Sequence, residues 1–170
     1  IQKYTYGTPF ETDAIVTSIP ASEGTPAYGT ISTENGFSFT YDMDDNDVVY
    51  GLGESNRGIN KRGYVYESNC SDQPNHTEDK ISLYGAHNFL VISGKQTFGL
   101  FVDYPGKLKF DIGYTLSSQL KITCEDADLY LYVIEGETPY DIVKQFRKII
   151  GRSYIPPKFA FGFGQSRWGY

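Results

Sequence analysis

Alternation of apolar and polar residues at every second position most constrains how this chain can fold. Residues 37–41 (FSFTY) place three aromatic rings on one face of an extended segment. The same pattern recurs at 108–112 and 120–124, and residues 129–134 also alternate but are partly apolar on both faces. A period of two is typical of strands that lie half-buried in a sheet. The pattern therefore predicts several strands rather than a helical domain.

The distribution of aromatic residues and glycine supports the same interpretation. The 170 residues include 15 Tyr, 11 Phe and 18 Gly. Aromatic residues favour pleated surfaces, and glycine favours the turns between strands. Two short apolar runs, 89–92 and 98–102, flank a predicted hairpin turn at 93–96. We expect a mostly β fold of two packed antiparallel sheets, a β-sandwich.

One segment has the features of an amphipathic helix, residues 139–150. Thr138 is a suitable N-cap, Pro139 suits the first helical position, and Asp141 favours the positive helix start. Apolar residues follow at helical spacing, and Gly151 can end the helix. We expect this helix to pack on the sandwich, completing a domain over residues 1–151.

The residues after the helix have a different pattern. Pro156 and Pro157 favour an extended connector. Residues 159–164 (FAFGFG) then alternate large apolar and small residues, as strands do inside a crowded barrel. We expect residues 152–170 to form a linker and the first strand of a truncated (β/α)₈ barrel.

Charge, cysteines and motif spacing argue against several functions. With 15 Lys+Arg against 21 Asp+Glu, the net charge of −6 argues against a nucleic-acid partner. No apolar run has the roughly 20 residues that a membrane span needs. Cys70 and Cys124 are expected to be free, partly buried thiols in a reducing compartment. His76 and His87 lack metal-ligand spacing, and the acidic residues 42–47 fit a solvated turn better than a calcium loop. No cofactor is expected.

Polar residues dominate a long irregular loop predicted from Glu54 to Ser82. Long loops in compact domains are usually functional or mobile, and this one offers the hydroxyl, amide and carboxylate groups that bind polyhydroxylated ligands. Asp72 can also be explained as the cap of a turn before Pro74. At the chain end, Trp168 would lie at the mouth of a pocket if a barrel strand precedes it, or would be an ordinary hydrophobic anchor.

Four segments resemble one known family in the correct order. Residues 50–54 (YGLGE) resemble its YGxGE segment, and 128–143 (DLYLYVIEGETPYDIV) resemble its strand, glycine and capped-helix block. Residues 151–162 (GRSYIPPKFAFG) resemble GRPxLPPxWALG, and 166–170 (SRWGY) resemble the SRxxY that ends the first barrel strand. The chain is similar to the amino-terminal part of glycoside hydrolase family 31, the α-glucosidases and α-xylosidases.

This resemblance implies a galactose-mutarotase-like sandwich before a catalytic (β/α)₈ barrel, with a sandwich loop reaching over the barrel mouth. It implies that Asp72 hydrogen-bonds substrate hydroxyls and that Trp168 stacks beside the cleaved sugar, with Gln73 and Arg167 as further binding candidates. The catalytic nucleophile and acid/base would lie beyond Tyr170, so this chain alone is expected to be inactive. The expected whole is a bacterial, cytoplasmic, retaining α-glucosidase that acts on small α-gluco-oligosaccharides without a cofactor.

Two alternatives remain open at this point. A stand-alone carbohydrate-binding or interaction module would have the same sandwich, but its segment 159–163 would expose an apolar face with no barrel to bury it. The terminal strand could instead pair with another copy of the chain and form a homo-oligomer.

Overall fold

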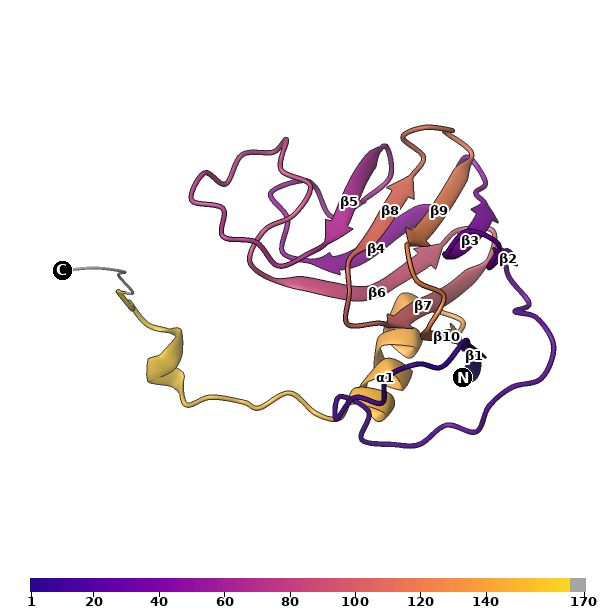
Figure 1. The fold of residues 1–170 in the computed structure, drawn as a ribbon. Coiled ribbons are helices and arrows are strands. Elements are labelled where there is room, and N and C mark those ends of the chain that lie inside the picture. The colour runs from indigo at the N-terminus through magenta and orange to yellow at the C-terminus, as the bar shows by residue number, and fades with distance from the viewer. Residues whose placement is uncertain (166–170) are drawn as a thin grey trace.

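The computed structural model describes residues 1–165, which form two five-stranded antiparallel sheets packed face to face, with one helix outside them (Figure 1). The first sheet has the order β1-β10-β7-β6-β4 and the second β2-β3-β9-β8-β5. The strands are β1 (Gln2–Tyr6), β2 (Thr30–Ser32), β3 (Phe37–Asp42), β4 (Val48–Gly53), β5 (Tyr64–Ser68), β6 (Ala86–Ser93), β7 (Thr97–Asp103), β8 (Leu108–Ile112), β9 (Gln119–Cys124) and β10 (Leu129–Glu135). The helices are α1 (Pro139–Ile150) and the 3₁₀ helix η1 (Lys158–Phe161). The predicted mostly β sandwich with one amphipathic helix is confirmed.

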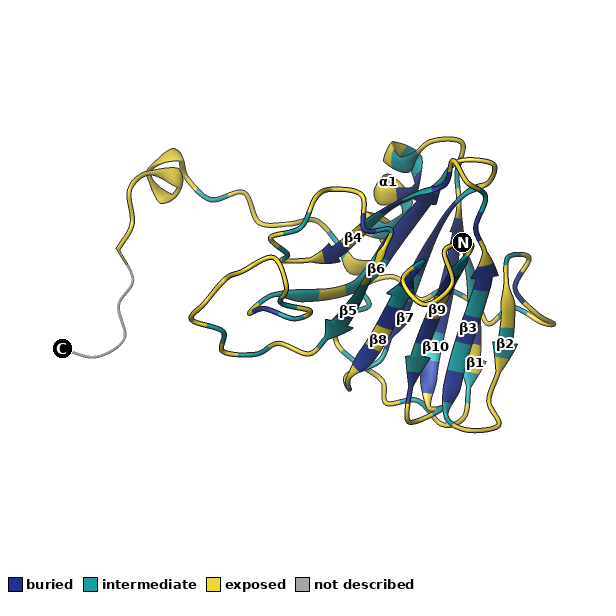
Figure 2. Ribbon diagram, turned by 90° about the horizontal axis from the view of Figure 1, so that it is seen from above, coloured by how far each residue is buried: buried dark blue, intermediate teal, exposed yellow. Residues whose placement is uncertain are grey.

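The period-two pattern marks the main core between the sheets. Phe37, Phe39 and Tyr41 of β3 point inward and are buried, while the residues between them are only half-buried. Across the second sheet, Phe39 lies opposite Ile122 in the register of β3 and β9. Inward faces are dark and outward positions paler along these strands in Figure 2. The alternation therefore indicates strands with one buried face and one solvent-exposed face, as is common in antiparallel sheets.

Strand β10 is buried on both faces because the first sheet is covered on both sides. Leu131 and Val133 belong to the core between the sheets, whereas Tyr132 and Ile134 pack outward beneath α1. A second, smaller core thus lies between the first sheet and the helix. The apolar character of both faces of residues 129–134 reflects this third layer.

Helix α1 occupies residues 139–150, as predicted, and its ends are fixed by local contacts. The Thr138 hydroxyl accepts a hydrogen bond from the Asp141 amide at 3.2 Å, and the Asp141 carboxylate accepts one from the Thr138 amide at 3.2 Å. This reciprocal capping box satisfies donors that the first helical turn leaves free. At the other end, the Val16 amide donates to the Ile149 carbonyl at 2.8 Å, so the N-terminal segment helps to close the helix.

Two turns between strands were anticipated, and one of them differs from the prediction. The hairpin at 93–96 joins β6 to β7 as expected. The acidic stretch 42–47 links one sheet to the other, and its Asp47 is buried rather than solvated. The Asp47 carboxylate accepts hydrogen bonds from the Tyr41 hydroxyl, the Asp44 amide and the Lys95 amide at 3.2, 2.9 and 3.0 Å. These three hydrogen bonds, one of them from Lys95 on a distant turn, make this burial favourable, since buried carboxylates need hydrogen bonds.

The segment predicted as the first barrel strand is not a strand in this chain. Lys158–Phe161 forms the short helix η1, and residues 152–165 extend away from the sandwich (Figures 1 and 2). A strand needs neighbours that complete its backbone hydrogen bonds. No strand of residues 1–165 pairs with this segment, so its backbone closes local bonds instead, from Ala160 to Pro157 and from Gly162 to Phe159.

Two further sequence-based expectations concern cysteines and membranes. Cys124 is buried and Cys70 is exposed, and both are free thiols, so the expected partial burial of both is wrong for Cys70. Burial raises the pKa of the Cys124 thiol to about 11. Within residues 1–165, no helix is long and apolar enough to cross a membrane.

Candidate functional site

The polar region from Glu54 to Ser82 is more ordered than its composition indicates. It contains β5 (Tyr64–Ser68), which pairs with β8 at the edge of the second sheet. The prediction of one long irregular loop is therefore wrong in its middle. The alternation of Tyr64, Val65 and Tyr66 was a usable signal for this strand. Residues 54–63 remain irregular, and so does a projecting loop, residues 69–85, between β5 and β6; we call this loop the polar loop (Figure 1).

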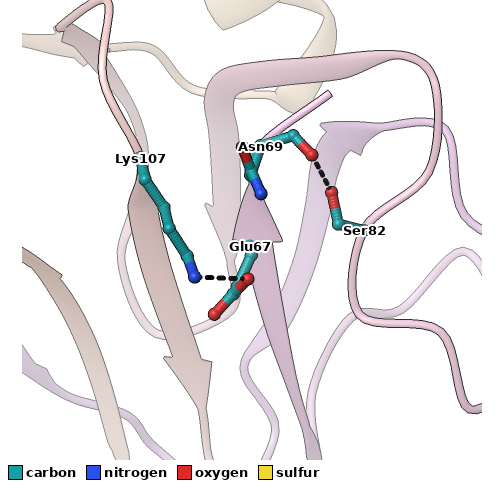
Figure 3. Close-up of polar contacts among 4 residues, drawn as sticks. All are labelled: Glu67, Asn69, Ser82 and Lys107. Atoms are coloured by element: carbon teal, nitrogen blue, oxygen red, sulfur yellow. Dashed lines mark hydrogen bonds and ion pairs between the residues drawn. The ribbon is translucent and has the colours of Figure 1, made fainter. Parts of the chain in front are cut away.

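The polar loop folds back on itself through hydrogen bonds near its base. The Glu67 amide donates to the Ile81 carbonyl at 2.8 Å, and the Ser71 amide donates to the Leu83 carbonyl at 3.0 Å. Between them, the Ser82 hydroxyl donates to the Asn69 carbonyl, as drawn in Figure 3. These bonds set the two arms of the loop side by side.

Arg57 fastens the far part of the polar loop to the sheet. Its guanidinium donates to the carbonyls of Glu78, Val65 and Asp79 at 2.7, 2.9 and 3.3 Å. It also lies 4.3 Å from the centre of the Tyr64 ring, a cation–π contact. One side chain thus joins the loop tip to β5, and a planar guanidinium with five donors suits this task.

Asp72, the principal binding residue expected from the sequence, lies exposed on this loop. Its Oδ1 accepts a hydrogen bond from the hydroxyl of Tyr84 at 2.5 Å. That bond raises the pKa of Tyr84, with smaller contributions from burial and from the Asp72 charge, while the Gln73 backbone amide bonded to the same hydroxyl lowers it. The ring of Tyr84 meets the ring of His76 edge to face at 5.4 Å.

The glycine-rich motif 50–54 ends at the same place. Gly51 and Gly53 have φ of 120° and 79°, and a bulge between them breaks the pairing of β4 with β6. A Cβ on Gly51 would lie 2.4 Å from the Phe89 carbonyl oxygen, so glycine is required there. The bulge delivers Glu54 to Gly85: Glu54 Oε2 accepts from the Gly85 amide at 2.9 Å, and the Glu54 amide donates to the Gly85 carbonyl at 2.8 Å.

A groove of about 500 Å³ lies at the foot of the polar loop. It is formed by the end of β5, the start of β6 and the turn between β7 and β8. Beside it, Lys107 and Glu67 form an ion pair at 2.9 Å (Figure 3). Inside it, Asn88 accepts from the Ser68 hydroxyl and donates to the Tyr104 carbonyl at 3.0 Å. The groove therefore contains an amide, that of Asn88, whose orientation is fixed by its neighbours.

The structure brings together only some of the residues expected to bind substrate. Asp72 and Gln73 are adjacent to the Tyr84 hydroxyl. Arg167 and Trp168 lie outside the described residues. Tyr84, Glu54 and Arg57 were missed as parts of the site, because only folding reveals the contacts that join them to the polar loop. Among residues 1–165, no three His, Cys, Asp or Glu side chains cluster as a metal site would require.

Comparison with known proteins places the chain in a family. Residues 9–111, more than half of the chain, match the model of the glycosyl hydrolase 31 N-terminal galactose mutarotase-like domain. The chain therefore belongs to the glycoside hydrolase family 31 N-terminal domains.

Individual relatives agree with this assignment. The chain is 31% identical over 147 residues to alpha-glucosidase 2 of Bacillus thermoamyloliquefaciens, covering 81% of this chain but 19% of that protein. It is 27% identical to alpha-xylosidase XylQ of Lactiplantibacillus pentosus, with coverages of 71% and 15%. A glycoside hydrolase family 31 dextranase of Flavobacterium johnsoniae, solved with isomaltotriose, superposes with a TM-score of 0.70 at 25% identity, with coverages of 78% and 16%. The chain thus spans less than a fifth of the length of these relatives.

Proposed function

We propose that this chain is the amino-terminal sandwich of a retaining α-glycosidase, specifically an α-glucosidase that releases terminal glucose from small α-gluco-oligosaccharides. The observation that carries this proposal is the polar loop held by hydrogen bonds, with Asp72 exposed next to Ser71 near its base. The names of the relatives, which include α-glucosidases and a dextranase solved with isomaltotriose, support a sugar substrate. The polar loop would contribute hydroxyl-binding groups to a pocket completed by a catalytic barrel.

The chemistry assigned to that barrel follows from the requirements of retention. A retaining glycosidase needs two carboxyl groups about 5 Å apart, one that attacks the sugar and one that protonates the leaving oxygen. Neither of these roles is assigned to the sandwich. The role proposed for the sandwich, substrate orientation, needs no cofactor. Its contribution is orientation: a carboxylate such as Asp72 accepts hydrogen bonds from sugar hydroxyls and restricts the positions in which the substrate is attacked.

The tail after α1 is proposed to be the first barrel strand in the whole enzyme. Its support is exposure: Phe159, Phe161 and Phe163 are 83%, 73% and 99% exposed. Burying each ring would contribute about 1.5–3 kcal/mol. The tail and the polar loop leave the same end of the sandwich (Figures 1 and 2). This placement supports an arrangement in which Trp168 and Arg167 reach the substrate beside Asp72 and Gln73.

The decisive experiment replaces Asp72 in the full-length protein that carries this domain. Asp72→Ala should lower kcat/KM for maltose by about tenfold or more, because a hydrogen bond to a charged group contributes about 1.5–3 kcal/mol. The control is Asp45→Ala, an exposed carboxylate in the turn between β3 and β4. Equal kinetics for both variants would refute the assignment of the polar loop to the substrate pocket.

A second measurement separates the enzyme from a stand-alone binding module. The chain alone should show no turnover of maltose, and calorimetric titration with glucose or maltose should show no binding. Turnover above a control for contaminating enzyme would refute the proposal that the catalytic groups lie elsewhere. Tight binding by the chain alone would favour the carbohydrate-binding module.

We also propose a reducing, cytoplasmic setting, which is supported by the two free thiols Cys70 and Cys124. Thiol titration of the natural protein under denaturing conditions should find both reduced; modification or cross-linking of either would contradict this setting.

A further inference from the structure

The polar loop contains a contact that the proposed function does not by itself require. Tyr84 and Asp72 lie on opposite arms of the loop, each following in sequence one of the two residues joined by the bond from the Ser71 amide to the Leu83 carbonyl. The hydroxyl of Tyr84 donates to Asp72 Oδ1 at 2.5 Å although both side chains are exposed. An exposed carboxylate ordinarily turns freely in solvent, because holding a surface pair in one geometry costs side-chain entropy. A hydrogen bond that holds the exposed Asp72 carboxylate in one orientation therefore calls for an explanation.

Tyr84 is itself held from two sides. Its ring meets the ring of His76 at 5.4 Å and 70°, which restricts rotation about its side-chain bonds. The next residue, Gly85, is joined to Glu54 by two hydrogen bonds, at 2.9 and 2.8 Å. Glu54 in turn follows the bulge at the end of β4. A continuous series of contacts therefore runs from the sheet to the Tyr84 hydroxyl and ends at the carboxylate of Asp72.

The geometry points to Tyr84 as a positioning residue that orients Asp72 for a hydroxyl of an α-gluco-oligosaccharide. The bond occupies Asp72 Oδ1 and leaves Oδ2 for the sugar. The carboxylate is then already in one orientation before substrate binds, so less rotamer freedom is lost on binding. This inference rests on the proposed function, because it assumes that Asp72 contacts substrate. It adds a residue to which the sequence assigned no role.

The test is a double-mutant cycle in the full-length protein with maltose as substrate. Tyr84→Phe keeps the ring against His76 and removes only the hydroxyl, so the loop should keep its fold. We expect KM to rise about fivefold, from the lost charge-assisted bond and the freed carboxylate, with a smaller change in kcat. In an Asp72→Ala background, Tyr84→Phe should have no further effect on KM, since the carboxylate that the hydroxyl orients is gone.

The outcomes separate this inference from the proposed function. If Asp72→Ala weakens kinetics but Tyr84→Phe leaves KM unchanged, Tyr84 is not a positioning residue and the pocket assignment survives. If the two effects are additive, Tyr84 acts independently of Asp72 and the inference is wrong. If Asp72→Ala itself has no effect, the proposed function fails first. Tyr114→Phe, at an exposed tyrosine after β8, is the matched control and should leave KM unchanged.

Discussion

Two consecutive apolar segments of this chain differ sharply in how far they are buried. Helix α1 buries Ile142 and Ile149 completely against the first sheet. The tail that follows leaves Phe159, Phe161 and Phe163 almost fully exposed, although it is at least as apolar. The difference lies in what each segment finds: α1 faces an apolar sheet surface that includes Tyr132 and Ile134, whereas the tail has no partner among residues 1–165. Burial of an apolar segment is favourable, but it occurs only where the fold offers an apolar surface to pack against.

The largest loss of stability is expected for a substitution in the second core, beneath α1. Ile142→Ala should lower the free energy of unfolding by about 2–5 kcal/mol, because it leaves a cavity beneath the helix. Ile142 is fully buried, whereas its neighbour Val143 is 41% exposed. Val143→Ala is therefore the control and should cost far less. Urea unfolding followed by circular dichroism measures both; similar losses would mean that the helix is not seated as described.

The helix cap should matter less than the helix core. Thr138→Ala removes the hydroxyl that accepts from the Asp141 amide and should cost about 1 kcal/mol. Thr138→Ser keeps an equivalent hydroxyl and should retain most of the stability. The same urea titration gives both values. A Ser variant as unstable as the Ala variant would show that the methyl group, not the cap, carries the effect.

Removal of a buried hydroxyl beneath α1 is expected to preserve or raise stability, in contrast to the two substitutions above. Tyr132 is fully buried, and its hydroxyl has no hydrogen-bond partner in the described part of the chain. Tyr132→Phe should thus leave stability at neutral pH unchanged or raise it by up to about 1 kcal/mol. Burial raises the pKa of Tyr132 from 10.0 to about 12, with help from the Asp103 charge.

The raised pKa makes this prediction pH-dependent. The phenol stays protonated in the folded state up to about pH 12 but ionises near pH 10 when unfolded. Its contribution is fully present below pH 10 and is lost as the pH rises toward 12. The Phe variant lacks this loss, so its advantage over the parent should grow across that interval in urea titrations. A constant difference would contradict the raised pKa.

The comparison also shows how far sequence reasoning reaches. Period two and the capping box are local signals, so the main strands and residues 139–150 were predictable. The burial of Asp47 and the Tyr84–Asp72 contact depend on residues brought together only by folding. The tail shows the limit of a local pattern: alternating large and small residues describe what residues 159–164 suit, but a strand also needs neighbours to pair with, and this chain forms η1 there instead. Asp72 was found through family resemblance, not through its geometry.

The smallest stability effect should come from the tail. Phe161→Ser should change the free energy of unfolding of the 170-residue chain by no more than about 0.5 kcal/mol, since the ring is 73% exposed and loses little packing. Ile149→Ser, at a fully buried position on α1, is the contrasting variant and should be severely destabilising. In the full-length protein, however, Phe161→Ser should lower stability by several kcal/mol if a barrel covers the ring. Urea titrations of both lengths test the contrast, and an equally mild effect in both would show that this ring is not buried in the whole protein.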